Sequence, residues 1–221
     1  MDVKEAINRR QSVRAFSRRS LEREKLTAVL EAALRTPSWA NTQPWEIYVA
    51  AGEALERVRA AYMGSFEQEE PRRSDIPRPE AWPPAMLKRM EELREARVKA
   101  LEADLGGEAA RADMMTLNRE FFRAPAVIYL CMDRTLTPWS IFDIGMLAQS
   151  IMLAATEAGL GTIPAYNLVV YPDILHEELD IPEELSVIIG IAIGYQDEDH
   201  PQNRFRSKRR AASEAVRIRE N

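Results

Sequence analysis

The stretch SVIIGIAIG, residues 186–194, is a continuous apolar run. It predicts a central β-strand, because a strand that is covered on both faces carries apolar side chains at every position. A second run, AVIYLCM at 126–132, follows Pro125 and predicts another buried strand. Residues 45–50 and the segment that begins at 162–164 are predicted to be shorter extended pieces. The core of the fold is therefore predicted to be a sheet.

The predicted helices outnumber these strands. The helix over residues 140–158 is apolar nearly all round, which is typical of a helix in a core or an interface. We therefore expect a mixed α/β or α+β domain whose central sheet is covered by helices. The other predicted helices are the opening residues up to Arg9-Arg10, a helix capped by Ser20, residues 53–62, a long amphipathic segment that ends at Gly106-Gly107, residues 108–122 and residues 172–179.

The composition is that of a soluble globular protein. The chain has 221 residues, 30 Lys and Arg against 35 Asp and Glu, a net charge of −5 and 46% hydrophobic residues. The acidic balance argues against a nucleic-acid binder, which needs a basic face. Residues 1–5 have neither the basic nor the apolar region of a signal peptide. Residues 141–155 are interrupted by Asp143 and Gln149, so we expect no membrane span and a cytoplasmic protein.

Side-chain nucleophiles and metal sites are not expected. Cys131 is the only cysteine and lies inside an apolar strand, which predicts an inert core thiol. His176 is expected to be solvated on a surface helix, and His200 lies in a turn without an evident triad partner. No GxGxxG, P-loop, GxSxG or HExxH motif is present. If the protein is an enzyme, a bound organic cofactor should carry the reaction.

Two basic clusters are candidates for an anion site. If residues 10–14 are extended, Arg10, Ser12 and Arg14 point to the same side, where two guanidinium groups and a hydroxyl suit a phosphate. Taken alone, this run is also consistent with a solvated basic face. The tail segment 203–210 (NRFRSKRR) could bind nucleic acid or fold back onto the same anion.

The loop Pro37–Trp45 is rich in turn formers and offers amide and hydroxyl groups that could bind the polar edge of a heterocycle. Trp39 and Trp45 could pack on the flat faces of such a ring. The alternative is a well-capped connection with a core tryptophan, and for Trp45, which leads into a strand, this alternative is favoured.

Together these motifs resemble the flavin-dependent nitroreductase family. The resemblance covers nearly the whole chain, in the family's order. It is carried by Arg9-Arg10-Gln11-Ser12-Val13-Arg14-Ala15-Phe16, by Pro37-Ser38-Trp39-Ala40-Asn41-Thr42-Gln43-Pro44-Trp45, by Gly159-Leu160-Gly161-Thr162-Ile163-Pro164, and by Gly194-Tyr195 followed by Asn203-Arg204-Phe205-Arg206.

The resemblance implies an α+β fold, a three-layer sandwich with a central, mostly antiparallel sheet, in an intertwined homodimer with FMN at the interface. One subunit would hold FMN through Arg10, Gln11, Ser12 and Arg14, with Arg206 and Lys208 or Arg209 closing on the phosphate. The other subunit would contribute Pro37, Ser38, Trp39 and Asn41. The ring's polar and N5 edges would face Asn118, Pro164, Ala165 and Tyr166.

The implied activity is an FMN-dependent NAD(P)H oxidoreductase that reduces nitroaromatics, quinones or similar electrophiles. NADH or NADPH would reduce FMN and leave before the acceptor takes the hydride, so we expect ping-pong kinetics and no catalytic side chain. A positive charge near flavin N1 and O2 favours the anionic reduced form, and Arg14 is the candidate for it.

The chain departs from the family pattern in two places. Ala165 and Tyr166 stand where a polar residue such as Gln or Glu is expected after Pro164. Residues 63–108 are expected to be an insertion at the pocket rim of one domain, 1–221, in which 195–221 is a C-terminal extension. Other family reactions (ene reduction, reductive dehalogenation, oxidative use of FMN), a non-catalytic flavin-binding protein and an RNA-binding protein are the alternative functions.

Overall fold

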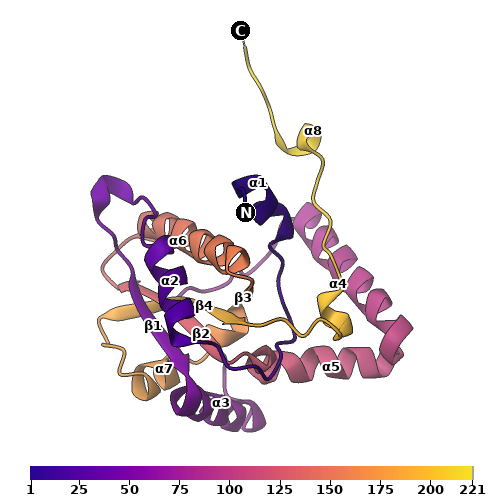
Figure 1. The fold of residues 1–221 in the computed structure, drawn as a ribbon, viewed down its shortest axis with the longest axis horizontal. Coiled ribbons are helices and arrows are strands. Elements are labelled where there is room, and N and C mark those ends of the chain that lie inside the picture. Colours follow the sequence, from indigo (N-terminus) through magenta and orange to yellow (C-terminus); the bar gives the residue numbers. More distant parts are fainter. Residues whose placement is uncertain (221) are drawn as a thin grey trace.

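A single four-stranded sheet forms the centre of the computed structural model, which describes residues 1–220. Its strands are β1 (Glu46–Ala51), β2 (Ala126–Asp133), β3 (Gly161–Ala165) and β4 (Leu185–Gly194), in the order β1-β2-β4-β3 (Figure 1). All three pairings are antiparallel. The two apolar runs thus form the two inner strands, as predicted, and the expectation of an antiparallel sheet is confirmed.

Helices cover both faces of the sheet, so the fold is the expected three-layer α+β sandwich. On one face α2 (Arg23–Ala33) and α6 (Pro138–Glu157) pack on Ile128, Leu130 and Ile191. On the other face α3 (Gly52–Glu67), α5 (Gly107–Arg119) and α7 (Pro172–Glu178) surround Tyr129 and Val187. Alternate residues of β2 belong to the two cores because strand side chains alternate between the faces.

Several helix boundaries differ from prediction, and two of them have a clear physical cause. Ser20 does not cap α2, which begins at Arg23 after Glu22, with no side-chain cap. Glu22 itself accepts a hydrogen bond from the Tyr195 hydroxyl at 2.7 Å, and Ser17 N–H donates to Tyr195 O at 2.9 Å, so the chain before α2 stays tied to the end of β4. The helix predicted through Phe122 ends at Arg119 because residues 121–123 adopt left-handed φ values of 52°, 59° and 60°.

The helix α6 is longer than expected. It begins at Pro138, after Thr137 as N-cap, and its 20 residues are long and apolar enough to cross a membrane by length and composition. One such helix is weak evidence for a membrane span. Core helices of soluble proteins pass the same test. Here Ile144, Leu147 and Ile151 are buried against the sheet, which makes α6 a core helix.

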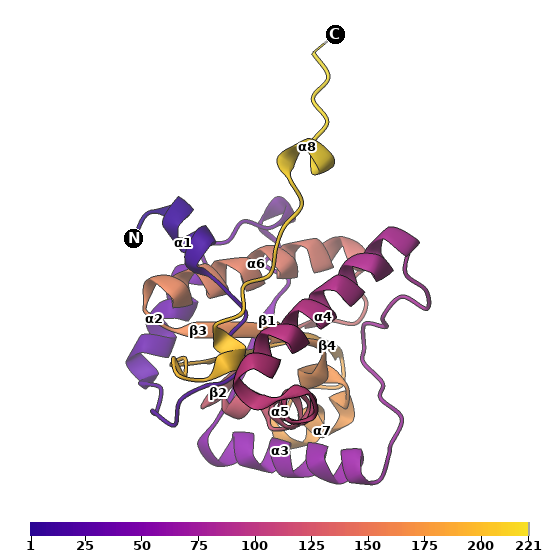
Figure 2. The ribbon, with the colours of Figure 1, turned by 90° about the vertical axis from the view of Figure 1, so that its right-hand side faces the viewer.

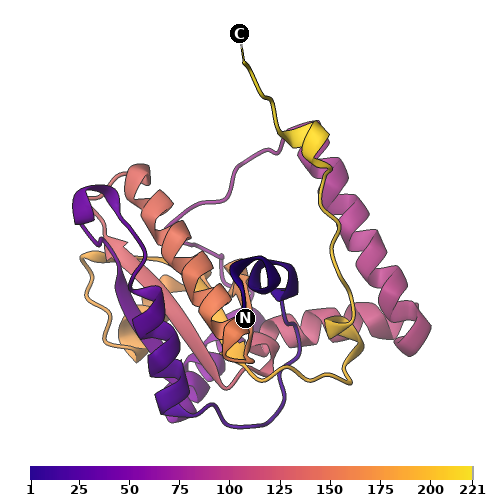
Figure 3. The ribbon, with the colours of Figure 1, turned by 45° about the horizontal axis from the view of Figure 1, so that its top comes forward.

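Three segments extend from this body. α1 (Val3–Arg9) lies beside α6, α4 (Pro84–Leu105) continues into α5, and the C-terminal segment passes α4 and projects away with the short α8 (Ala212–Ala215) (Figures 2 and 3). Leu101 is the only buried residue of α4. The accessible surface is 13,723 Å². A compact monomer of 25.2 kDa exposes about 10,300 Å². The chain is therefore unusually open.

Candidate functional site: a basic cleft

Several residues of the predicted anion site line a cleft of about 620 Å³ between residues 7–14 and the C-terminal segment. Residues 10–14 are extended because Ser12 forms a parallel bridge with Thr162 of β3 and Val13 N–H donates to Thr162 O at 3.0 Å. Val13 consequently points into the core, where it is 1% exposed. The side chains of Arg10, Ser12 and Arg14 line the cleft instead. The cleft residues used below, which we call the basic cleft, are Arg10, Gln11, Ser12, Arg14, Arg206 and Arg209.

The basic cleft concentrates positive charge. Burial, followed by the nearby charges of Arg209 and Arg206, lowers the pKa of Arg10. None of these three arginines forms a salt bridge within residues 1–220. Guanidinium groups that repel one another and have no carboxylate partner are well suited to a phosphate dianion. The donor set thus fits the phosphate of FMN.

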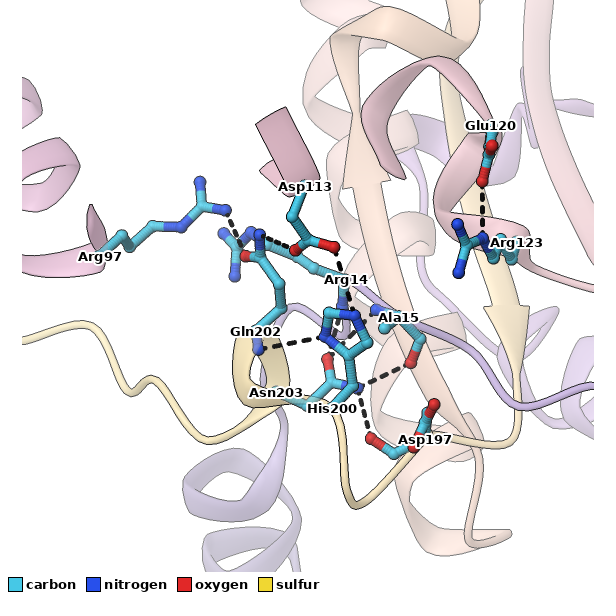
Figure 4. A network of polar contacts seen from close by, with 10 residues as sticks. All are labelled: Arg14, Ala15, Arg97, Asp113, Glu120, Arg123, Asp197, His200, Gln202 and Asn203. Carbon is cyan, nitrogen blue, oxygen red and sulfur yellow. Dashed lines mark hydrogen bonds and ion pairs between the residues drawn. The ribbon is translucent and has the colours of Figure 1, made fainter. Parts of the chain in front are cut away.

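Asn203 joins the C-terminal segment to the basic cleft. This residue is 3% exposed, and its Oδ1 accepts from the backbone N–H groups of Arg14 at 2.8 Å and Ala15 at 3.3 Å. Its Nδ2 donates to the carbonyls of Ala15 at 2.7 Å and Asp197 at 2.8 Å (Figure 4). One buried amide therefore sets the position of the segment that carries Arg206 relative to the segment that carries Arg14.

A polar network extends from this point to the helical arm formed by α4 and α5. Gln202 Nε2 donates to Asp113 Oδ2 at 3.0 Å, and Arg97 Nη2 donates to Gln202 Oε1 at 2.9 Å. His200 lies between Asp113, whose Oδ1 is 3.5 Å from Nε2, and the Gln202 N–H, which donates to Nδ1 at 3.3 Å. Figure 4 shows Arg14 and Arg97 extending toward the same region. The network ties α4 to Gln202, which precedes the Asn203 anchor of the basic cleft.

The loop that contains Pro37, Ser38, Trp39 and Asn41 lies elsewhere, beyond the end of α2 and beside the N-terminal half of α6 (Figure 1). Ser38 Oγ accepts from Gln43 N–H at 2.9 Å, and Trp39 N–H donates to the buried Asp143 at 3.3 Å. Asn41 has a left-handed φ of 58°, and Trp39 is 62% exposed. The loop is thus held by hydrogen bonds but directed outward. Trp45 is buried in the core, so the core alternative for that residue is confirmed.

The remaining predicted residues do not line the basic cleft. Asn118 lines a groove between α4 and α5. Pro164 and Ala165 end β3, and Tyr166 begins the following short helix, where its hydroxyl lies 3.2 Å from Ser74 Oγ. Lys208 is exposed on the C-terminal segment. One protomer therefore brings together only part of the predicted set.

Cys131 and His176, two further groups that could react or titrate, are both buried in the protein. Burial raises the pKa of the Cys131 thiol to about 12, in line with the predicted inert cysteine. The expectation that His176 is solvated was wrong. It is buried, with Nδ1 donating to Ile181 O at 2.8 Å and Nε2 accepting from Arg134 at 3.2 Å. Both ring nitrogens are occupied, so this histidine has a structural role. No cluster that could hold a metal ion occurs in the described part of the chain.

The sequence pattern gives no sign of a role for Arg97, Asp113, Gln202 or the His200 ring. It places Asn203 in a family motif and at the start of the basic tail segment, without indicating its buried hydrogen bonds. The alternation of side chains along residues 10–14 can be predicted from the sequence. The side of α4 that carries Arg97 toward the network cannot, because only one residue of this helix is buried and no apolar stripe marks its inner side.

Comparisons with known proteins identify the family of this chain. The model of the Nitroreductase family matches residues 7–195. The chain is 28% identical to 4-nitrobenzoate reductase of Pseudomonas putida (96% of this chain, 92% of the relative) and 31% identical to chloronitrobenzene nitroreductase of Comamonas testosteroni (94% and 92%). The crystal structure of the FMN- and NADPH-dependent nitroreductase NfnB from Sphigopyxis sp. strain HMH superposes with a TM-score of 0.92 at 29% identity, covering 100% of both chains. The chain belongs to the nitroreductase family.

Proposed function

We propose that this protein is an FMN-dependent NAD(P)H oxidoreductase that reduces nitroaromatic compounds, quinones or similar electrophiles. The observation that carries this proposal is the basic cleft, whose arginines at the phosphate end have no carboxylate partner within residues 1–220. The names of the relatives, which are nitroarene reductases, support the substrate class. NfnB, described as dependent on FMN and NADPH, supports the cofactor and the reductant.

The chain's own residues bind and orient the cofactor in this proposal. Arg10, Ser12, Arg206 and Arg209 hold the phosphate, with Lys208 at the cleft's margin, and Gln11 and Arg14 lie along the rest of the molecule. Asn118, Pro164, Ala165 and Tyr166 face the ring edge. When bound, FMN supplies two-electron hydride chemistry at N5. The protein's part is to place donor and acceptor in turn over one ring face and to exclude water.

The proposed active unit is a homodimer. The surface of the chain exceeds that of a compact monomer by roughly 3,400 Å², which is more than the roughly 1,000–2,500 Å² that each subunit of an obligate dimer typically buries. Trp139 and Phe142 on α6 are 65% and 68% exposed, next to the outward-facing loop. A second copy that covers this face would bring its Pro37, Ser38, Trp39 and Asn41 to the cofactor, which explains why one protomer separates them from the basic cleft.

The insertion, residues 63–108, is proposed to form the pocket rim within one domain that spans 1–221, with 195–221 as an extension. In support, Arg97 on α4 reaches the network beside the basic cleft. The proposed location is the cytoplasm, because Cys131 is the only cysteine and no disulfide is required.

A visible absorption spectrum of the protein loaded with FMN tests the proposal. We expect the flavin bands to bleach when NADPH or NADH is added without oxygen and to return when 4-nitrobenzoate or a quinone follows. A flavin that binds but does not bleach would favour a non-catalytic binding protein. Failure to bind FMN would refute the assignment of the basic cleft, and salt-sensitive RNA binding would then be the function to test.

A further inference from the structure

The guanidinium groups of Arg14 and Arg97 form a second centre of positive charge, apart from Arg10, Arg206 and Arg209. Arg14 comes from the extended segment and Arg97 from α4, 83 positions later in the chain. Both side chains are half-buried. Burial and then the charge of Arg14 lower the pKa of Arg97 to about 10, and burial lowers the pKa of Arg14. Figure 4 shows both side chains extending toward one region, so the two cations lie near each other and are partly shielded from solvent.

No carboxylate of residues 1–220 forms an ion pair with either cation. Arg14 Nη1 donates to the Ser12 carbonyl at 3.1 Å, and Arg97 Nη2 donates to the side-chain carbonyl of Gln202 at 2.9 Å. Asp113, the acid of this network, is instead bonded to Gln202 Nε2 and lies beside His200. Two half-buried, unneutralised cations are costly for the protein alone. A ligand that carries negative charge would offset this cost, which explains why two unpaired cations lie near each other.

The spacing of the two charge centres suits one elongated ligand. In an extended segment, Arg10 and Arg14 are four residues apart, which corresponds to about 13 Å. The centre at Arg10 has three arginines that can bind a phosphate, so the same ligand should present a second electron-rich group near Arg14. In FMN, the ribityl chain separates the phosphate from the N1–C2=O edge of the ring, and this edge is the second group.

We propose that Arg97 joins Arg14 in holding the N1–C2=O edge of FMN and that this pair of cations stabilises the negative charge of the reduced ring. This inference rests on the proposed function. A hydride delivers two electrons and one proton, so the ring gains one negative charge unless a second proton binds. Arg97 is a positioning residue supplied by the insertion, and Gln202 orients it. The insertion thereby raises the redox potential of the cofactor.

The test compares Arg97→Gln with Arg97→Lys and with a control, Arg89→Gln. Arg89 lies on the same helix, but its side chain is exposed and makes no ion pair within residues 1–220. The first measurement is the FMN dissociation constant, from flavin fluorescence. The second is the midpoint potential of bound FMN, from anaerobic equilibration with a reference dye. We expect Arg97→Gln to weaken binding of reduced FMN about tenfold more than binding of oxidised FMN. Tenfold corresponds to a midpoint potential lower by about 30 mV for a two-electron couple.

Arg97→Lys should keep a midpoint potential close to that of the wild type, because the charge remains, and Arg89→Gln should change neither the dissociation constant nor the potential. A folded Arg97→Gln variant with an unchanged potential overturns the inference, even if the variant is less stable. If Arg97→Gln does not fold, Gln202→Ala provides the test, because it removes the carbonyl that accepts the hydrogen bond from Arg97. An unchanged midpoint potential in this variant would refute the proposed role of Arg97. If the wild-type protein binds no FMN, the proposed function itself has failed, which is a separate result.

Discussion

Replacing Asn203 with alanine should both destabilise the fold and weaken FMN binding. Its side chain makes four hydrogen bonds, two accepted from the N–H groups of Arg14 and Ala15 and two donated to the carbonyls of Ala15 and Asp197. Each bond contributes about 0.5–1.5 kcal/mol net, and buried backbone groups left without partners add to the cost. We therefore expect the free energy of unfolding to fall by about 2–4 kcal/mol.

For a chain of this size, that loss lowers the melting temperature by roughly 4–16 °C. Urea and thermal unfolding at one fixed protein concentration measure it, since a dimer's stability depends on concentration. The control is Gln68→Ala, which changes an exposed side chain after α3. Its free energy of unfolding should lie within about 0.5 kcal/mol of the wild-type value. The FMN dissociation constant should rise as well, because residues 14 and 206 lose their common support. If Asn203→Ala lowers the free energy of unfolding by less than about 1 kcal/mol and leaves FMN affinity unchanged, Asn203 does not hold the two segments together.

Three further predictions concern other parts of the molecule. Arg206→Ala should raise the FMN dissociation constant by at least tenfold and reduce its salt dependence, measured by fluorescence titration, and equal affinity at all salt concentrations would contradict a phosphate contact. Phe142→Asp should shift the dimer to monomers in sedimentation, with loss of FMN, whereas an active monomer would exclude a shared site. The native Cys131 thiol should resist iodoacetamide at pH 8 and Cys131→Ser should retain turnover. Because its pKa is raised to about 12, the thiol's contribution to stability is fully present below pH 9 and is lost as the pH rises toward 12, so the unfolding free energy should decline in that interval in pH-dependent urea titrations.

Much of the framework was predictable from local pattern. The runs at 186–194 and 126–132 are apolar at nearly every position, and a segment with that property has few alternatives to an inner strand. The N-terminus of α2 was not predictable from the capping rule, because Tyr195, at the far end of the chain, bonds Glu22 and holds the preceding residues extended. His176 was expected to be solvated because its helix starts with Pro172, and only the packing of Arg134 and Ile181 around the ring shows otherwise.

The sequence by itself determined that Arg10, Ser12 and Arg14 would share one side of an extended segment, because strand periodicity is a local property of the backbone. It also carried the motifs of the nitroreductase family. Only the tertiary structure decided that the tail approaches this segment through Asn203, that the loop at 37–41 faces away from the same protomer's cleft, and that Arg97 lies beside Arg14. These contacts join residues that lie 80 to 190 positions apart in the chain. The helix α4 has only one buried residue, so its sequence has no periodic apolar pattern that would indicate which side faces the protein. Contacts of that kind follow from how the layers pack.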